Sequence, residues 1–172
     1  MKHVSAPVLA LARLLALAAG LCAAAAWADE YSDVGKLLRA GQLEQARARV
    51  DRHLATKPRD PQMRYFRGLI QRESGQQAEA LATFTKLAED FPELPEPYNG
   101  LAVIYAAQGD YDQARAALEQ AVRANPGYAI AHENLGDLYA RLATQAYCQA
   151  LKIEAGNTTV KSKVDKLGAP CP

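Results

Sequence analysis

The distribution of apolar residues along the chain predicts pairs of amphipathic helices. The clearest stretch is 95–128, where one apolar set follows helical spacing, a turn signal intervenes, and a second apolar set follows. The first set is Tyr98, Leu101, Ala102 and Tyr105, and the second is Ala114, Leu118 and Ala121. Two faces of this kind predict two helices that pack against each other.

Glycine, alanine and proline recur at an interval of 34 residues. The positions are Gly41, Gly75 and Gly109, then Ala46, Ala80 and Ala114, then Pro58, Pro92 and Pro126. Glycine permits a turn between two helices, and proline prevents the second helix from running into the next unit. Because a single helical hairpin cannot bury its apolar face alone, we expect several hairpins to stack on one another.

The unit 95–128 resembles the tetratricopeptide repeat (TPR). Eight positions match the family pattern, namely Tyr98, Leu101, Ala102, Tyr105, Ala114, Leu118, Ala121 and Pro126. The resemblance implies an all-α fold, a right-handed α-solenoid of helix-turn-helix repeats. It also implies a non-catalytic scaffold for protein–protein interaction.

Two further units precede this one. The unit 61–94 keeps Gly68, Gly75, Ala80, Phe84 and Pro92, with its apolar face moved to Met63, Phe66 and Ile70. The unit 29–60 matches mainly in its second half and has a short first helix. We expect Gly68, Ala102 and Gly136 to lie where two helices of a unit approach most closely, since a larger side chain there would overpack the crossing.

The fourth unit, 129–155, lacks the turn. His132, Leu135, Gly136 and Tyr139 match a first helix, but the next apolar set begins five residues too early. That set is Ala143, Tyr147, Ala150 and Ile153. No glycine or proline lies between Leu138 and Glu154. We therefore expect one continuous helix of roughly 24 residues that ends with Gly156 as its C-terminal cap. Residues 156–172 are predicted to form a short capping helix and a tail.

The N-terminal residues 1–28 have the features of a cleavable signal peptide. Lys2 and Arg13 precede the apolar stretch Leu14–Ala26, and small residues flank Trp27 before Asp29. We expect cleavage after Ala28, a periplasmic location and no membrane insertion afterwards. The alternative is an uncleaved anchor over 8–28, although Arg13 near its middle would be costly in lipid.

Composition offers little metal, redox or catalytic chemistry. Once the leader is removed with Cys22, the cysteines that remain are Cys148 and Cys171. They either form a disulfide in an exported protein or remain as a buried helical cysteine and a terminal thiol. His53 and His132 lack ligand spacing, so we expect neither metal nor cofactor, with His53 simply on a helix face. No catalytic residue can be nominated, which argues against an enzyme.

Charge is balanced overall and uneven along the chain. The formal net charge is +1, and loss of Lys2 and Arg13 with the leader would make it −1. Basic residues predominate over 36–72 and acidic residues over 73–137. Near neutrality, together with an export signal, argues against nucleic acid as a partner. The uneven charge favours a protein partner of complementary polarity.

The resemblance also implies where a partner would bind, because the first helix of each TPR unit lines the concave surface. Carried over by position, the groove residues are Tyr65, Leu69 and Arg72, then Asn99, Val103 and Ala106, then Glu133, Asp137 and Arg141. Tyr65 offers a rigid apolar surface, Asn99 can bond to a peptide backbone, and Glu133 with Asp137 would attract a basic side chain. Packing between helices is the alternative role, particularly for Leu69 and Val103.

Three functions fit these features. The first is an adaptor that holds a segment of another exported protein or peptide in its groove, in envelope assembly, secretion or folding. The second is an accessory of cytochrome c maturation that presents an apocytochrome tail, as similar bacterial TPR proteins do. The third is a self-associating structural component, a homodimer in which the stacking face of the first unit pairs with another copy.

Overall fold

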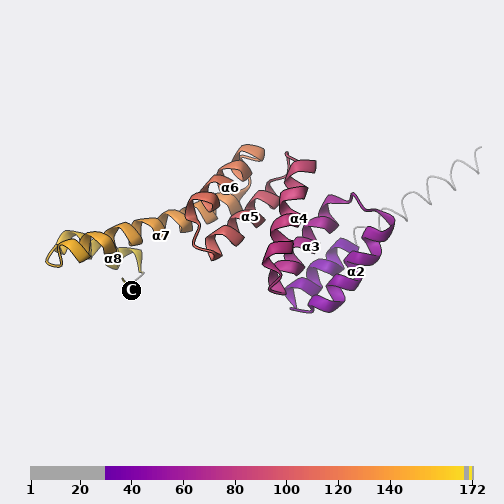
Figure 1. Cartoon of the computed structure of the whole chain (residues 1–172), viewed down its shortest axis with the longest axis horizontal. Helices are drawn as coiled ribbons and strands as arrows, with labels where there is room; N and C mark the ends of the chain where they lie inside the picture. The colour runs from indigo at the N-terminus through magenta and orange to yellow at the C-terminus, as the bar shows by residue number, and fades with distance from the viewer. Residues whose placement is uncertain (1–29, 169–170, 172) are drawn as a thin grey trace, which may run out of the picture. The chain divides into compact units, whose positions relative to one another are not determined.

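A computed structural model describes residues 30–168 and 171, and the described secondary structure is entirely helical. Successive helices are joined by short turns (Figure 1). The chain divides into two compact units, one ending at Phe66 and one beginning at Arg67. The leader predicted over 1–28 lies outside the described residues. None of the described helices is long and apolar enough to cross a membrane.

The first compact unit contains the N-terminal repeat. A helix over 30–39 is followed by α2 (Leu43–Thr56) and by the start of α3 (Pro61–Glu73). Its apolar core consists of Val34, Ala46, Val50, Leu54 and Met63, all nearly inaccessible to solvent. The first helix therefore contributes to the core, as the apolar position Val34 requires, although the sequence matched the repeat pattern poorly there.

The periodic glycines end the first helix of each of three successive repeats in the same way. Gly41, Gly75 and Gly109 have φ angles of 67°, 77° and 79°, in the left-handed region. In each case the next residue donates its N–H to a carbonyl five residues back, for example Asp110 to Tyr105 at 3.0 Å. This is the Schellman arrangement, and glycine adopts it without a Cβ clash. The 34-residue period therefore reflects a repeated backbone turn.

The second compact unit begins within α3 and contains α4 (Gln77–Asp90), α5 (Pro95–Ala107) and α6 (Tyr111–Ala124). The fully buried ring of Phe84 on α4 fills the space between Gly68 on α3 and Gly100 on α5. A Cβ atom on Gly68 would overlap that ring, and one on Gly100 would lie 2.8 Å from its Cε2 atom. Gly68 is thus a close-approach position, as expected, and Gly100 is a second one that the sequence pattern did not reveal.

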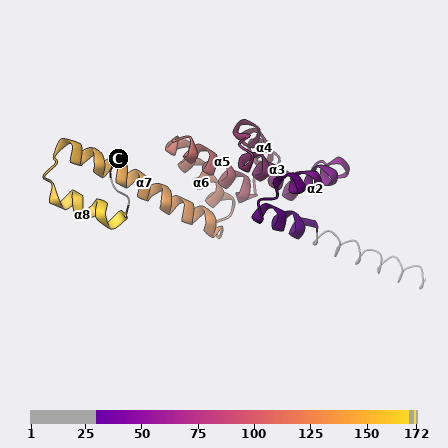
Figure 2. The same ribbon diagram turned by 90° about the horizontal axis from the view of Figure 1, so that it is seen from below.

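The fourth unit forms one uninterrupted helix, α7 (Ala129–Ile153), of 25 residues. The expected cap at Gly156 is wrong, because the helix ends at Ile153 with Glu154 as C-cap and Gly156 does not take a positive φ. The side chain of Asn157 caps the following helix, α8 (Thr158–Leu167), by accepting from Val160 N–H at 3.0 Å. That cap fixes where α8 begins and leaves Gly156 in the connecting turn. Figure 2 shows α8 running back alongside the second half of α7.

Candidate protein-binding surface

A small hollow lies between α5, α6 and α7, with a volume of about 300 Å³. Val103 and Ala106 from α5 form part of its wall, and Asp137 and Arg141 from α7 stand at its charged side. Leu118 of α6 adds to the apolar part. An apolar wall with a few charged groups is suited to holding one side chain of a polypeptide and orienting it.

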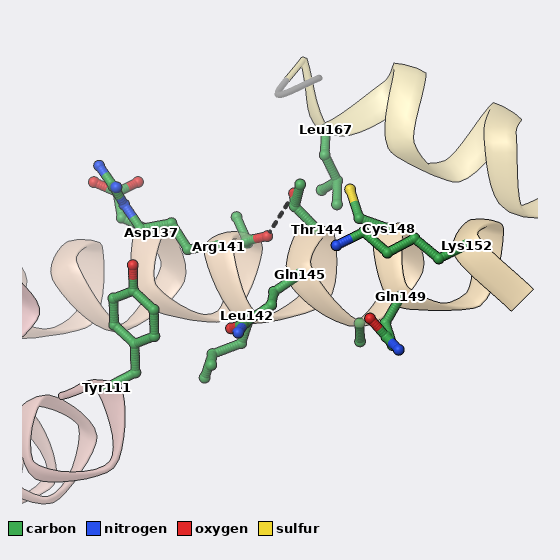
Figure 3. A pocket seen from close by; sticks show the side chains of 12 residues that line it. Tyr111, Asp137, Arg141, Leu142, Thr144, Gln145, Cys148, Gln149, Lys152 and Leu167 are labelled. Carbon is green, nitrogen blue, oxygen red and sulfur yellow. Dashed lines mark hydrogen bonds between the residues drawn. The ribbon is translucent and has the colours of Figure 1, made fainter. Parts of the chain in front are cut away.

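A second, larger hollow of about 1230 Å³ follows α7 towards α8 and shares Asp137 and Arg141 with the first (Figure 3). Tyr111 at the start of α6 and Leu167 at the end of α8 bound it, while Thr144 contributes from α7. The two hollows therefore adjoin at the same pair of charged residues. Together they form a trough along α7, which we call the α7 trough.

Four of the nine groove residues inferred from the family thus come together, namely Val103, Ala106, Asp137 and Arg141. Asn99 departs from the expectation. It is only 8% exposed, and its side-chain oxygen accepts a hydrogen bond of 2.6 Å from Nδ2 of Asn134. The bond joins α5 to α7, so Asn99 aligns two helices and its amide is not open to a ligand backbone.

The remaining groove residues do not line these two hollows. Leu69 and Arg72 are half-buried on α3, and the Arg72 guanidinium binds the carboxylate of Glu73 at 2.7 Å. Tyr65 belongs to the first compact unit, with its ring centre 6.4 Å from that of Phe66. Glu133 is exposed on α7. The candidate surface in the second unit is therefore centred on α7.

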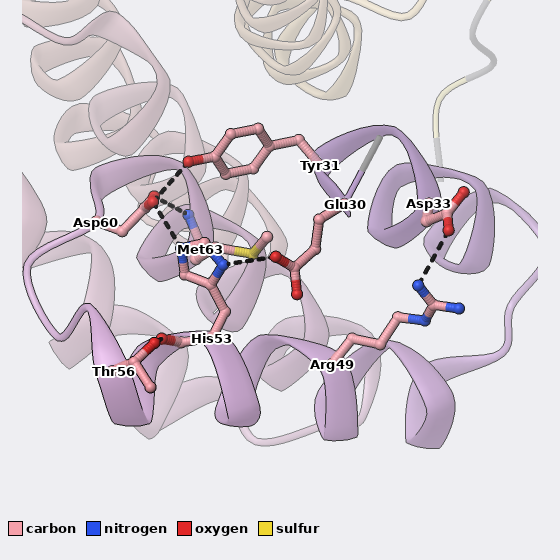
Figure 4. Close-up of polar contacts among 8 residues, drawn as sticks. All are labelled: Glu30, Tyr31, Asp33, Arg49, His53, Thr56, Asp60 and Met63. Carbon is pink, nitrogen blue, oxygen red and sulfur yellow. Dashed lines mark hydrogen bonds and ion pairs between the residues drawn. The ribbon is translucent and has the colours of Figure 1, made fainter. Parts of the chain in front are cut away.

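A polar cluster around the buried His53 in the first unit was not predicted from the sequence. His53 on α2 is buried, and its Nδ1 and Nε2 atoms each lie 2.9 Å from a carboxylate oxygen, of Glu30 and Asp60 respectively (Figure 4). Asp60 also accepts a bond of 2.6 Å from the Tyr31 hydroxyl. When both carboxylates are ionised, both contacts can be hydrogen bonds only if each imidazole nitrogen carries a proton. We call Glu30, Tyr31, His53 and Asp60 the His53 cluster.

Hydrogen bonding within the His53 cluster shifts two pKa values in opposite directions. The bond to Asp60, burial and the nearby carboxylates raise the pKa of Tyr31 to about 12. Burial alone would raise the pKa of Asp60, but bonds from Tyr31, from Met63 N–H and from His53 outweigh it and lower that pKa below its usual value. No group of three or more metal-ligating side chains in the described part of the chain is arranged to hold a metal ion.

A disulfide between Cys148 and Cys171 links the tail to α7, with the two Cα atoms 5.4 Å apart. Cys148 and Val164 are buried where α7 and α8 meet. The ammonium of Lys163 lies 5.4 Å from the centre of the Tyr147 ring, a cation–π contact across the same junction. These contacts hold α8 against the second half of α7.

The first half of α7 is open on the side that a second helix covers in a complete repeat. Ala102 on α5 is buried, whereas Gly136, its equivalent 34 residues later, is exposed, with nothing within 4 Å of a Cβ position. Tyr105 is half-buried, and its equivalent Tyr139 is 49% exposed. The deleted turn therefore leaves a repeat face uncovered.

The stacked helical hairpins define a helical-repeat scaffold for protein–protein interaction. Two family models described as tetratricopeptide repeat match residues 36–95 and 71–142, which together exceed half of the chain. The chain belongs to the tetratricopeptide repeat family.

Curated relatives share only the repeat region. A probable biofilm formation methyltransferase, WspC, of Pseudomonas putida is 37% identical over 91 residues, which is 53% of this chain and 22% of that protein. A chloroplast tetratricopeptide repeat domain-containing protein of Arabidopsis thaliana is 34% identical over 83 residues, 45% of this chain and 28% of that protein. The chain thus spans about a quarter of these relatives, and the similarity does not carry methyltransferase activity to it.

Solved structures support the fold. A thermophilic TPR protein of Thermus thermophilus has a TM-score of 0.62 at 26% identity, with 81% of this chain and 79% of that chain aligned. The Sgt2 TPR domain of Aspergillus fumigatus has a TM-score of 0.59 at 18% identity, covering 66% of this chain and 77% of that one. TPR proteins are in general non-catalytic scaffolds that bind protein or peptide partners.

Proposed function

We propose that this chain is a periplasmic adaptor that holds a segment of another exported protein in the α7 trough, in support of envelope assembly, secretion or folding. The observation that carries the proposal is the adjoining of two hollows at Asp137 and Arg141. A continuous trough can take several successive side chains of one segment, which a single isolated pocket cannot.

The trough also limits the chemistry of the segment. Val103, Ala106 and Leu118 favour an apolar side chain in the smaller hollow, where burial contributes about 25 cal/mol per Å². Asp137 and Arg141 carry opposite charges, so we expect a segment with a basic and an acidic group near that apolar residue. The exported location rests on the leader features of residues 1–28 and on the disulfide, which persists in oxidising compartments.

Charge-matched double variants test the trough. Asp137→Ala with Arg141→Ala removes the shared pair, and Asp112→Ala with Arg115→Ala removes an exposed pair on α6 that lies 3.2 Å apart. Partner capture from a periplasmic extract should fall at least tenfold for the first variant and stay unchanged for the second. Equal capture by both variants would refute the trough as the binding site.

Photocrosslinking supplies an independent readout. A photoreactive phenylalanine analogue at Ala106, in the trough, should crosslink the same partner that pull-down recovers, whereas the analogue at the exposed Ala116 on α6 should not. The exported state is checked by N-terminal sequencing of the protein from fractionated cells, which should begin at Asp29. Recovery from the cytoplasm with residues 1–28 intact would refute the periplasmic assignment.

A further inference from the structure

The apolar residues of α7 form one continuous stripe along the whole helix. At 100° per residue, both apolar sets of the fourth unit fall on the same side, because the helix runs through without a turn. The stripe comprises His132, Leu135, Gly136, Tyr139, Leu142, Ala143, Ala146, Tyr147, Ala150 and Ile153. The set contains no Asp, Glu, Lys or Arg. We call this set the α7 stripe.

Five residues of the stripe are exposed and five are half-buried, and Leu142 and Ala146 also line the larger hollow of the α7 trough. Tyr139 is 49% exposed and Ile153 is 81% exposed, and both are large apolar residues. Gly136 has open space around it. At the margin of the stripe, the Tyr147 ring contacts the ammonium of Lys163 on α8. A long uncharged face of this kind on a helix is typical of an interface.

The complete repeats show what covers such a face. In the unit 61–94, Gly68 of the first helix faces the ring of Phe84 from the second helix. The matching residues of the fourth unit are Gly136 and Tyr147, both on α7. They lie eleven positions apart on one rigid helix and cannot reach each other. The chain thus carries both halves of a repeat interface and cannot close it internally.

We propose that two copies of the chain close this interface by pairing their α7 helices antiparallel, so that the second half of each helix completes the fourth repeat of the other. Tyr147 of one copy then covers Gly136 of its partner, as Phe84 covers Gly68. The midpoint of the matched pair 136/147 falls between residues 141 and 142. A two-fold axis at this midpoint makes Tyr147 of each copy cover Gly136 of the other, as a closed isologous dimer requires.

Size and charge agree with a pair of this kind. From His132 to Ile153 the stripe runs about 32 Å at 1.5 Å per residue. Two helices in contact over that length bury on the order of 1,200 Å², at the low end of specific interfaces, so we expect a dissociation constant of roughly micromolar order. In a two-fold pair, any charged residue near the axis would face its own copy and repel it. The stripe holds no Asp, Glu, Lys or Arg, so pairing brings no like charges of the stripe together. This surface differs from the stacking face of the first unit.

Sedimentation of two leucine variants tests the pairing. Gly136→Leu fits the isolated chain, where the position is open, but would collide with Tyr147 of the partner. It should weaken dimerisation at least tenfold and leave helicity unchanged. Ser162→Leu adds the same side chain at an exposed position of α8 and should leave dimerisation unchanged. A wild-type protein that stays monomeric up to millimolar concentration, or equal effects of the two variants, would overturn the proposal.

Cysteine crosslinking tests the direction of the pair. Leu142→Cys lies beside the proposed axis and should form an intermolecular disulfide on mild oxidation. In the antiparallel pair, two copies of Ile153→Cys are about 35 Å apart and should not crosslink, although this position is far more exposed. Crosslinking through Ile153→Cys without Leu142→Cys would overturn the antiparallel arrangement. Recovery of a monomer with a foreign helix on the stripe would assign the face to another partner.

Discussion

The first and last repeats depart from the family pattern in opposite ways. The first is a closed hairpin in which helix 30–39 and α2 are joined by the partly buried His53 cluster. The last is a single helix whose apolar face stays open and whose end is fixed by a disulfide and α8. Terminal repeats lack a neighbour on one side. In this chain, polar bonds stabilise the first repeat and a disulfide stabilises the last one.

The largest expected effect follows from breaking the closed end. His53→Ala leaves the carboxylates of Glu30 and Asp60 without the imidazole that both contact. The Asp60 side chain is only 10% exposed. We expect a loss of about 3 kcal/mol in the free energy of unfolding of the first unit. Chemical denaturation measures it, with Arg49→Ala on the same helix, which removes an exposed ion pair to Asp33, as the control that should change stability by about 0.5 kcal/mol or less. Equal losses in both variants would contradict a special role of the cluster.

The disulfide should matter nearly as much at the other end. Replacing both Cys148 and Cys171 by serine opens a loop with a sequence separation of 23 residues. Loop-closure entropy then predicts a loss of about 3 kcal/mol in the docking of α8 on α7. Hydrogen exchange should accelerate in α8 and remain unchanged in α2. Unchanged protection of α8 would mean that its apolar contacts alone are sufficient.

A pair of glycine substitutions compares a covered repeat with the open one. Gly68→Ala forces a Cβ into the Phe84 ring, which Gly100 confines from the other side, and should destabilise the second unit by about 2 kcal/mol. Gly136→Ala meets open space in mid-helix and should stabilise α7 by about 1 kcal/mol through helix propensity. Thermal unfolding of both variants at low protein concentration reports the difference. A change in stability of the same sign for both variants would contradict the assignment of a covered face at Gly68 and an open face at Gly136.

The smallest effect is a pH dependence confined to the first unit. The pKa of Tyr31 is raised to about 12, so its contribution to stability is fully present below pH 10 and is lost as the pH rises through 12. Asp60 has a lowered pKa, so its contribution is lost as the pH falls below its ordinary value of 3.8. Denaturation curves of the wild type and Tyr31→Phe should differ less at pH 12 than at pH 8. An equal difference at both values would contradict the bond to Asp60.

Much of the fold was predictable because it depends on local backbone chemistry. Gly41, Gly75 and Gly109 mark turns that need positive φ, and the absence of glycine and proline after Gly136 predicts the continuous α7. Position within the repeat placed Val103, Ala106, Asp137 and Arg141 on one surface, and these four residues line the smaller hollow, whereas partner binding there stays a prediction.

What the sequence missed depends on partners distant along the chain. His53 was interpreted as a helix-face residue because its carboxylate partners lie 23 and 7 residues away and share no motif with it. Asn99 was assigned to ligand binding because its hydrogen-bond partner, Asn134, lies 35 residues away and no sequence pattern links the two. The helix end at Ile153 was misplaced at Gly156, because the cap by Asn157 of the following helix outweighed the glycine signal.

The most direct test restores the missing turn. Inserting a copy of residues 107–111 after Ala140 returns the fourth unit to the spacing of the unit 95–128. If the deletion is what opens this repeat, α7 should become a hairpin, Tyr139 should lose its exposure to solvent quenchers of tyrosine fluorescence, and the protein should sediment as a monomer. An inserted chain in which Tyr139 stays exposed and association is unchanged would contradict the account.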